Sequence, residues 1–395
     1  MTRDPMGFAL SMMNRLAANP LLDRFGLRAP LEKTAYHGTR SGFRALSVAG
    51  REFRRMTSWL PTNRLPGRDP AELFDLSLTD AQRMITDLLG RFAREELRTA
   101  AATADETGKI PDDIATAATE LGLPLYAIPE AFGGVAEHQS PVTSVLIAEQ
   151  LAWGDMGLAT ALLAPFSMAQ ALTRWGTGEQ QSRYLPAFCG DQPPVATIAI
   201  DEPTPLFDPL TLQTSARKTG TGYTLNGLKN AVVQGESAEL LLVAAELDGQ
   251  PRLFIMEAGT PGLGVKADPT MGLRAAGAAR LLLENVEVSA DALLGEDDFD
   301  YQAFLDCGSL LRCGLAIETD SMRMLTWRAA SRLEQGLPAH RETALARLLC
   351  NEKAMAAGTN GVQLLGGHGF VKEHPVERWY RDLRSVAALT GGLHA

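Results

Sequence analysis

The residues with the most distinctive types and spacing lie near the carboxyl end of this 395-residue chain, in QLLGGHGFVKEHPVERWYRDLRSVAALTGG from Gln363 to Gly392. Gly366 and Gly367 end a helical run that begins at Glu342. Two glycines there fit a helix end that needs positive φ, and they leave the backbone unshielded by side chains. The helical run predicts an apolar stripe of Leu345, Leu348, Leu349, Ala356 and Val362. Beyond Pro375, a basic segment carries Arg378, Arg381 and Arg384 beside Trp379 and Tyr380.

This segment resembles the carboxyl-terminal signature of acyl-CoA dehydrogenases, a Q-x-x-G-G-x-G-[YF] turn followed by P-V-E-R-x-x-R-D and then by E-G-T. The matching residues are Gln363, Gly366, Gly367, Gly369, Phe370, Pro375, Val376, Glu377, Arg378, Arg381 and Asp382. The family's Glu-Gly-Thr falls at 390 to 392, where this chain has Thr390, Gly391 and Gly392. The resemblance therefore ends at Thr390, where most of the family has its catalytic glutamate. Threonine at this position cannot accept the substrate proton.

The reaction that this resemblance implies removes a proton next to a thioester carbonyl while the neighbouring carbon delivers a hydride to flavin. Such a weakly acidic proton needs a carboxylate base in a dry pocket and hydrogen-bond donors on the thioester oxygen. Some relatives place the base near the positions of Cys307 to Ser309. The acid nearest to these positions, Asp306, matches an Asp that precedes the base in the family, so we assign it to substrate binding. For Glu318, about three turns further on, a relocated base and a solvated or capping acid both stay open.

The resemblance also implies FAD. At the flavin edge the family reads T-E-P-x-x-G-S-D, and this chain reads DEPTPLFD from Asp201 to Asp208. Asp201 replaces the hydroxyl that would bind the ring, and an anion there disfavours reduced, anionic flavin. The Leu206-Phe207 pair replaces Gly-Ser and blocks close approach of the backbone. The family's W-I-T-N-G is AVVQG here, from 231 to 235. The cofactor contacts that the resemblance leaves are Ile200, Asp201, Val233, Gln363, Gly366 and Gly367, and the substitutions argue against FAD binding.

Two further parts of the family pattern are altered. The R-K-x-F-G loop, which a neighbouring subunit supplies to the flavin nucleotide in the family, is not found. SLLRCGLAIETD runs almost directly into SMRMLTWRAASRLEQGLPA, so that the helical bundle is either shortened or completed by a partner.

The arginine that the family carries near the start of its C-terminal helical domain is missing here, and Ser309 is the residue nearest to its position. Arg274 lies in a turn that resembles the family's G-x-R segment, and we favour a structural loop arginine there over a substrate-binding one.

The elements that would position these residues change along the chain. From Leu76 the pattern is helical, with Thr79 or Asp80 as an N-cap and apolar residues at Met84, Leu88, Leu89, Phe92 and Leu97. Around Val195 the period becomes that of five to seven short strands, and helices resume after LLGEDDFDYQAF. The resemblance, over about residues 76 to 392, implies an α+β multi-domain fold. Its predicted parts are a basic extension (1–75), an N-terminal helical domain (76–194), a middle β-barrel domain (195–296) and a shortened C-terminal helical bundle (297–395).

Composition limits the class of protein. A hydrophobic share of 45% and a charged share of 21% are typical of a soluble globular protein, and no apolar stretch approaches the length needed to cross a bilayer. Neither the cysteines nor the six histidines show metal-ligand spacing, so we expect no metal. Net charge is −10, but residues 1–56 hold ten Arg or Lys against four acids, a net charge of +6. We expect a cytoplasmic protein that binds no nucleic acid, and whose basic arm binds an acidic membrane or protein surface or clasps a partner subunit.

The loss of the base, the flavin hydroxyl, the Trp of the W-I-T-N-G motif and the R-K-x-F-G loop together leads to one hypothesis. The chain is a catalytically degenerate acyl-CoA dehydrogenase homologue of fatty acyl-CoA metabolism. It acts as a supporting subunit in a homo- or hetero-oligomer with an acyl-CoA dehydrogenase-type subunit. Two alternatives stay open: an active FAD-dependent acyl-CoA dehydrogenase with a relocated base such as Glu318, and a membrane-surface scaffold. Acyl-chain length cannot be read from these motifs.

Overall fold

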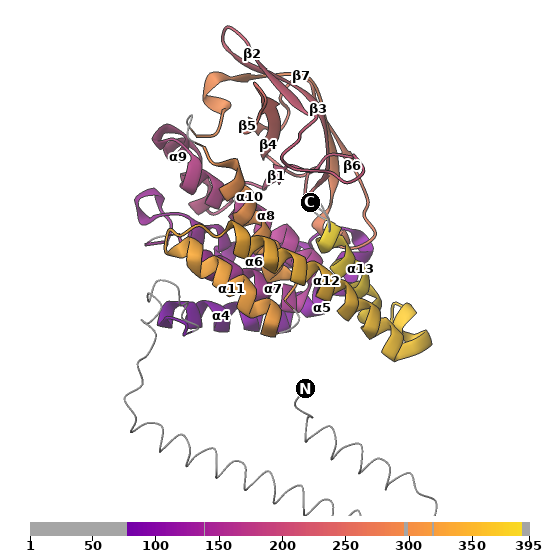
Figure 1. Ribbon diagram of the computed structural model, residues 1–395. Helices are drawn as coiled ribbons and strands as arrows, with labels where there is room; N and C mark the ends of the chain where they lie inside the picture. The colour runs from indigo at the N-terminus through magenta and orange to yellow at the C-terminus, as the bar shows by residue number, and fades with distance from the viewer. Residues whose placement is uncertain (1–76, 138, 296–298, 318–319, 389–395) are drawn as a thin grey trace, which may run out of the picture. The chain divides into compact units, whose positions relative to one another are not determined.

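The computed structural model describes residues 77–137, 139–295, 299–317 and 320–388. The predicted extension, including the basic residues 1–56, lies outside this part of the chain, and so do Glu318 and Thr390. Helices fill residues 80–189, strands run between 196 and 289, and helices return from Tyr301 (Figure 1). The predicted α+β order of helices, sheet and helices is therefore confirmed, while the proposed domain boundaries remain predictions.

The first helical region begins with a well-capped helix. Its helices are α4 (Asp80–Phe92), α5 (Arg98–Thr107), α6 (Asp112–Leu121), α7 (Pro141–Gly154), α8 (Met156–Trp175) and α9 (Gly178–Tyr184). Thr79 is the N-cap of α4, because its hydroxyl accepts a hydrogen bond from the Gln82 N–H at 3.1 Å. Leu89, Phe92 and Leu97 are buried as predicted, but Met84 is 73% exposed. Met84 was wrongly placed in the stripe, since it lies off the face that α4 turns toward α7.

Between α4 and α5 the chain forms a π-helical turn, η2 (Ala93–Leu97), which the apolar pattern did not predict. Short 3-10 turns follow at η3 (Leu123–Ala127), η4 (Glu130–Phe132) and η5 (Leu185–Cys189). Gly154, at the end of α7, packs directly on η2: a Cβ atom there would lie 2.8 Å from the Ala93 carbonyl oxygen. The small residue thus allows α7 to approach η2.

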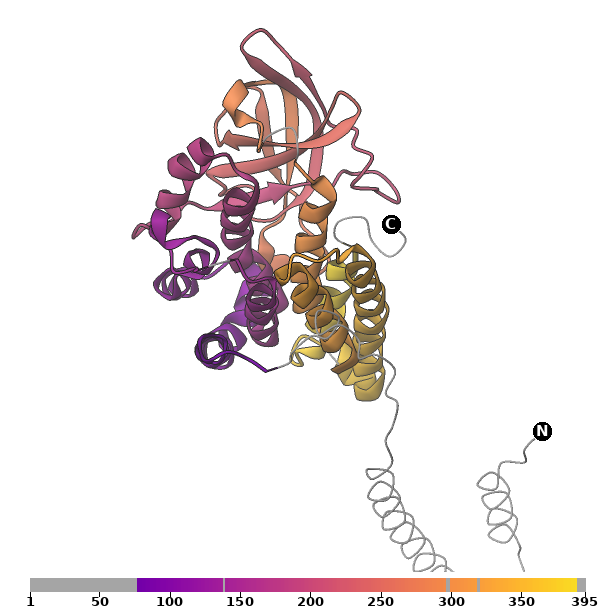
Figure 2. The same cartoon turned by 60° about the vertical axis from the view of Figure 1, so that its left-hand side comes forward.

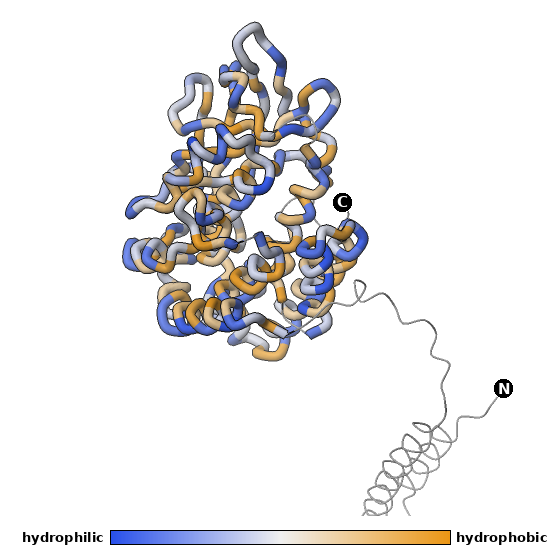
Figure 3. The backbone as a smooth tube through the Cα atoms, turned by 90° about the vertical axis from the view of Figure 1, so that its left-hand side faces the viewer, coloured by the Kyte–Doolittle hydropathy of each residue, from blue (hydrophilic) through white to orange (hydrophobic). Residues whose placement is uncertain are grey.

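Helix α8 corrects one expectation from composition. Over its 20 residues an 18-residue window has a mean hydropathy of 1.3, which is long and apolar enough to cross a membrane. It is the one such helix in the described part of the chain. In this fold 72% of that window is buried, as in the core helix of a globular domain, and α8 packs on α7, α10 and strand β1. In Figure 3, hydrophobic segments occur in the helices as well as in the strands.

The middle region is one seven-stranded sheet that follows an open, half-barrel path (Figure 2). Its strands are β1 (Ala196–Ala199), β2 (Ser215–Lys218), β3 (Gly222–Val232), β4 (Leu240–Leu247), β5 (Gln250–Glu257), β6 (Leu263–Ala267) and β7 (Ala279–Ser289). The order is β1-β4-β2-β3-β7-β6, with β5 paired to β4. β1 runs parallel to β4, and β3, β5, β6 and β7 form antiparallel pairs. The number of strands lies within the predicted five to seven.

The last region contains α10 (Tyr301–Leu315), α11 (Asp320–Glu334), α12 (His340–Leu365) and α13 (Val376–Ala388). The predicted apolar stripe on α12 is confirmed at Val362, which is buried, and at Leu349, which is partly buried, but it is wrong at Leu345 and Leu348, which are exposed. The side that α12 buries carries mainly small residues, namely Glu342, Thr343, Ala346, Cys350, Ala354, Gly358 and Val362. A Cβ atom at Gly358 would lie 3.1 Å from Tyr380 Cα, so close packing against α13 selects small residues rather than leucines.

Candidate functional site

Two cavities meet where β1 and the end of β3 approach helices α8, α10 and α13. The large cleft has a volume of about 700 Å³, and the small cavity one of about 150 Å³. Four residues line both: Thr160, Asp201, Ala231 and Val233. The predicted contacts Ile200, Asp201 and Val233 are therefore brought together, with Ile200 on the wall of the small cavity. This junction is the candidate functional site.

A local irregularity in the sheet shapes the junction. The pairing of β3 with β7 shifts register between Lys229 and Val232, and Ala231 takes a φ of 52°. Such a bulge re-aims the strand end and is typical of sheet positions beside functional sites. Gln234, also at positive φ, donates its side-chain N–H to the Ala161 carbonyl of α8 at 2.8 Å. The strand end is thus anchored to α8 beside the junction.

A buried ion pair lies directly behind Asp201. Lys229 Nζ is 2.8 Å from Glu202 Oε1 and 3.0 Å from the Ile200 carbonyl oxygen, and both charged side chains are almost fully buried. Glu202 also accepts hydrogen bonds from the backbone of Gln213 and Thr214 at 2.7 and 2.9 Å. Burial alone would raise the pKa of Glu202, but the Lys229 ammonium lowers it below its usual value. Sequence reasoning missed this pair, although a lone lysine inside the apolar strand GYTLNGLKNAV was the available signal.

The walls of the large cleft do not fit a flavin held as the family signature holds it. Leu206 has φ 53°, the left-handed region that favours glycine, and it stands at the position of the family's glycine. Phe207 is 9% exposed and its side chain helps to line the cleft. Where the family has a hydroxyl donor, Asp201 carries a carboxylate, which when ionised only accepts hydrogen bonds. The volume suffices for a ring system, but the chemistry of this wall does not suit the polar edge of a flavin.

The large cleft nevertheless carries unused polar atoms. Asn230 Oδ1 and Arg384 Nε are buried, belong to residues that line the cleft, and have no hydrogen-bond partner in the described part of the chain. One is an acceptor and the other a charged donor. Buried groups of this kind are costly unless a ligand or water satisfies them.

A guanidinium that the sequence analysis did not assign lines the small cavity. Arg312, on α10, reaches back one turn and donates to Ser309 Oγ at 3.0 Å. The side chain reaches Ser309 because long helical side chains point toward the helix N-terminus. The absence of the family's arginine at Ser309 stays a prediction. Burial lowers the pKa of Arg312, and the carboxylate of Asp201 opposes that effect. A cation and an anion therefore face the same cavity.

The predicted substrate residue Asp306 lies elsewhere. It lines a separate cavity of about 260 Å³ together with Ser309, His340 and Thr343. Its carboxylate accepts a hydrogen bond from Gln302 Nε2 at 3.1 Å and lies 3.5 Å from His340 Nδ1. Burial raises the pKa of Asp306. The structure therefore does not bring Asp306 to the junction at Val233.

The glycine turn also lies apart from the junction. Gly366 ends α12 at φ 57°, ψ −131°, a conformation that glycine favours, while Gly367 does not share the positive φ. Gln363, Gly366 and Gly367 are exposed and line neither cavity. Arg274 lines neither cavity as well, and lies in the short turn η6 (Arg274–Ala276) that follows the cleft wall. Its assignment as a structural arginine remains a prediction.

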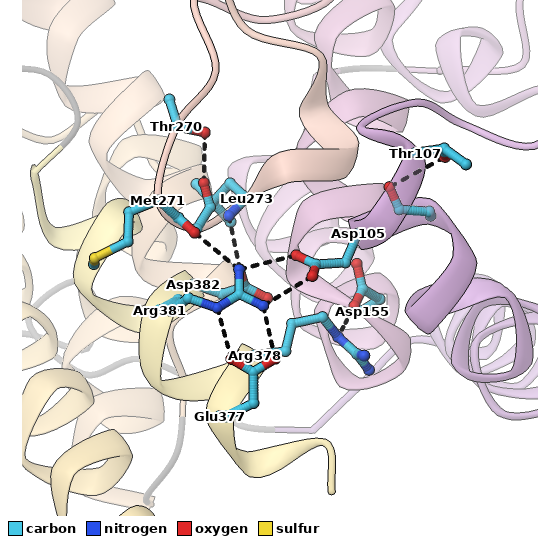
Figure 4. Close-up of polar contacts among 12 residues, drawn as sticks. Asp105, Thr107, Asp155, Thr270, Met271, Leu273, Glu377, Arg378, Arg381 and Asp382 are labelled. Carbon is cyan, nitrogen blue, oxygen red and sulfur yellow. Dashed lines mark hydrogen bonds and ion pairs between the residues drawn. The ribbon is translucent and has the colours of Figure 1, made fainter. Parts of the chain in front are cut away.

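The basic helix α13 clamps the cleft wall through Arg381 and Asp382, and Arg384, Ser385 and Ala387 of the same helix line the cleft. Arg381 lies among Asp105, Glu377 and the Met271 carbonyl oxygen, which it contacts at 2.8 to 3.0 Å (Figure 4). Asp382 accepts a hydrogen bond from the Leu273 N–H at 2.7 Å. Because residues 270–273 line the large cleft, this network sets the position of one wall. A Cβ atom at Gly272 would lie 2.3 Å from the Arg381 backbone, so the contact leaves no room for a side chain.

A second pair extends the clamp to α8. Arg378 Nε donates to Asp155 Oδ2 at 3.1 Å (Figure 4). Asp155 also caps α8 by accepting from the Leu158 N–H at 2.9 Å. Burial, and then the neighbouring Asp155, raise the pKa of Asp382 to about 7. In the described part of the chain no group of three or more His, Cys, Asp or Glu side chains could hold a metal ion.

The fold consists of a helical region, a half-barrel sheet and a second helical region, which meet at the large cleft. This order defines an acyl-CoA dehydrogenase-type architecture. The family models for the acyl-CoA dehydrogenase N-terminal, middle and C-terminal domains match residues 79–192, 197–286 and 312–392. The chain belongs to the acyl-CoA dehydrogenase family. This membership implies FAD as the cofactor of the family.

Individual relatives agree with this assignment. The chain is 27% identical to a cyclohex-1-ene-1-carbonyl-CoA dehydrogenase of Geobacter metallireducens, over 80% of this chain and 95% of the relative. It is also 27% identical to the mitochondrial short-chain specific acyl-CoA dehydrogenase of Rattus norvegicus, over 80% and 88%. The structure of butyryl-CoA dehydrogenase from Megasphaera elsdenii is similar, with a TM-score of 0.73 and 25% identity over 81% of this chain and 97% of that one.

Proposed function

We propose that this acyl-CoA dehydrogenase-like protein serves fatty acyl-CoA metabolism by binding acyl thioesters without desaturating them, and that it acts as a supporting subunit beside an active subunit of the same fold. The observation that carries the proposal is the wall of the large cleft. The Asp201 carboxylate and the Phe207 side chain line it where a flavin edge needs donors and open backbone. Leu206 keeps the glycine-like φ of 53°, so the loop retains its course while its side chains have changed.

The small cavity supports the proposal that the chain still binds acyl thioesters. The small cavity shares four wall residues with the large cleft, and it is lined largely by apolar side chains of α8 and α10. Asn230 and Arg384 line the adjoining cleft, and each has one buried side-chain polar atom without a partner in the described part of the chain. The amides of a CoA arm carry the complementary groups. An acyl thioester could therefore use both cavities without a flavin between them.

The proposed subunit role draws support from the exposed turn after α12. Four large apolar side chains are exposed there, namely Leu364, Leu365, Phe370 and Val371. They surround the exposed residues Gln363, Gly366 and Gly367, which in the family belong to a contact between subunits. Clustered exposed apolar residues are typical of protein–protein contacts. We therefore place the partner subunit on this turn.

The test uses the full chain purified from its host. We expect a colourless protein that does not reduce a dye acceptor when acyl-CoA is added, yet binds acyl-CoA in a calorimeter, and that co-purifies with a full-length homologue. A yellow protein whose flavin bands bleach with acyl-CoA would contradict the proposal and favour an active FAD-dependent dehydrogenase with a relocated base such as Glu318. The matched control is the F370S/V371S variant, which we expect to lose the homologue but keep acyl-CoA binding.

The remaining expectations concern residues 1–56. A cytoplasmic location, and binding of these residues to an acidic membrane or protein surface, stay predictions. Flotation with liposomes that contain anionic lipid, with and without residues 1–56, separates the scaffold alternative from the subunit role. Flotation that needs the basic arm, by a protein that binds no acyl-CoA, would favour the scaffold.

A further inference from the structure

Two histidines meet on the turn that follows α12, away from both cavities. The ring centroids of His368 and His374 lie 5.6 Å apart, and the ring planes make an angle of 77°. Both residues are exposed, and neither lines the small cavity or the large cleft. Their spacing in the sequence is not that of a metal-binding motif, so only the fold shows that they lie together.

The backbone at the first histidine is fixed against α12. His368 lies in the short helix η8 (Gly366–Phe370), which follows α12 directly. Gly369 packs η8 onto the end of α12, because a Cβ atom there would lie 2.4 Å from the Val362 carbonyl oxygen. His368 is therefore carried by a backbone that is held on both sides by close contacts and a helix end.

The backbone at the second histidine is fixed as well. The His374 N–H donates a hydrogen bond to the Val371 carbonyl oxygen at 3.2 Å, which closes the turn. Just beyond it, α13 begins at Val376, and a Cβ atom at Gly361 of α12 would lie 3.1 Å from Val376 Cγ1. Both ends of the turn are thus anchored on α12, and the distance between the two histidines follows from this backbone.

The imidazole nitrogens of the pair are not used within the protein. Neither ring makes a hydrogen bond or an ion pair in the described part of the chain. His340 differs, because its Nδ1 lies 3.5 Å from the Asp306 carboxylate. A neutral imidazole has one nitrogen with a free lone pair and is the commonest metal ligand in proteins. The pair therefore offers two such ligands side by side.

The distance between the rings suits two ligands of one metal ion. With a Zn–N distance of about 2.0 Å, each ring centroid lies about 3.2 Å from the metal, so two imidazoles at about 109° have centroids about 5.2 Å apart. The observed 5.6 Å is larger by only about 0.4 Å. A small rotation of either exposed side chain removes this difference, since χ2 of histidine is broad.

We propose that His368 and His374 form a two-histidine site for a divalent transition metal ion such as Zn²⁺, with water as the remaining ligands. No group of three or more His, Cys, Asp or Glu side chains that could hold a metal occurs in the described part of the chain, so this site has fewer protein ligands than a structural zinc site. Bound metal would link η8 to the residue before Pro375. It would thereby fix the segment that presents the exposed side chains of Phe370 and Val371.

The test titrates the full chain, freed of metal by a chelator, with Zn²⁺ in a calorimeter. We expect H368A and H374A each to weaken Zn²⁺ binding at least about tenfold, because the second imidazole binds in an intramolecular step of high effective concentration. H340A, which removes an exposed histidine outside the pair, is the matched control and should leave this binding unchanged. The variants should melt like wild type without metal, since the replaced rings are exposed.

Electron paramagnetic resonance of bound Cu²⁺ gives a second readout. We expect coupling to two imidazole nitrogens in wild type and to one in either single variant, and tighter binding of Cu²⁺ than of Zn²⁺. Zn²⁺ that binds H368A/H374A as tightly as wild type, or that does not bind wild type at all, would overturn the site. Acyl-CoA binding should be the same with and without Zn²⁺, so the outcome does not depend on the proposed function.

Discussion

Arg381 donates two hydrogen bonds to Asp105, at 3.0 and 2.8 Å, across 276 residues of sequence. The pair joins α13 to α5, and through the Met271 carbonyl oxygen it also holds the wall of the large cleft. Both side chains are mostly buried. The arginines and aspartate of the carboxyl-terminal signature are therefore structural in this chain, which explains their retention beside an altered cofactor wall.

Removal of the Arg381 side chain should leave Asp105 and Glu377 as buried carboxylates without their partner. We expect R381M to lower the free energy of unfolding by about 3 kcal/mol in urea denaturation. The double variant R381M/D105N should recover part of that loss. R83M, which removes an exposed arginine paired with Asp80, is the matched control and should change stability by less than about 0.5 kcal/mol. Equal effects of R381M and R83M would show that the clamp contributes little.

The Lys229–Glu202 pair makes a second prediction about the site. K229M leaves the Glu202 carboxylate uncompensated in the core and should destabilise the protein by about 3 to 5 kcal/mol. K229M/E202Q should be more stable than K229M, because the amide removes the buried charge, although it keeps only one acceptor oxygen for the two backbone N–H donors of Gln213 and Thr214. Urea unfolding of the three proteins measures both differences. A double variant as unstable as K229M would rule out the charge as the cause.

The left-handed conformation of Leu206 predicts a stabilising substitution. Leu206 is 84% exposed, so its side chain gains little from burial, while its φ of 53° is strained for a non-glycine residue. We expect L206G to raise the free energy of unfolding by about 1 kcal/mol. The control is L210G in the same loop, where Leu210 is 50% exposed and has no positive φ. That variant should not stabilise, and stabilisation by both would point to a general effect of glycine on the loop.

Asp382 predicts a dependence of stability on pH. Burial raises its pKa from an ordinary 3.8 to about 7, so between these values the folded protein holds a proton that the unfolded chain has released. The stability that this group contributes is thus fully present below about pH 4 and is lost as pH rises to about 7. D382N keeps an acceptor for the Leu273 N–H but does not titrate. Its stability relative to wild type should therefore increase between pH 4 and 7 in parallel urea titrations.

Asp155 lies in the same cluster and has its pKa raised by burial as well. The variant D382N should therefore reduce the slope of stability against pH without abolishing it. A slope that is the same in wild type and D382N would show that Asp382 is ionised in the fold throughout this range.

Motifs and periodicity predicted the order of helices, sheet and helices, and the site loops that carry Asp201 and Val233. These patterns did not predict which residues of a helix are buried where close helix packing determines the residue size. On α12, close contact with α13 at Gly358 selects small residues, so leucines that looked like a core stripe are exposed. The charge partners also escaped prediction. Lys229 and Glu202 are 27 residues apart, and Arg312 acts through a side chain that reaches one turn back, so neither relation has a signature in local spacing.

We infer that the cleft wall of Asp201, Leu206 and Phe207 has changed too far to hold a flavin. Equilibrium titration of the purified chain with FAD, followed by the quenching of flavin fluorescence, tests it directly. The matched variant is D201T/L206G/F207S, which restores the hydroxyl and the Gly-Ser pair of the family. We predict no saturable quenching for wild type and measurable binding for the variant. Saturable binding of FAD by wild type, as tight as that of the variant, would contradict the claim.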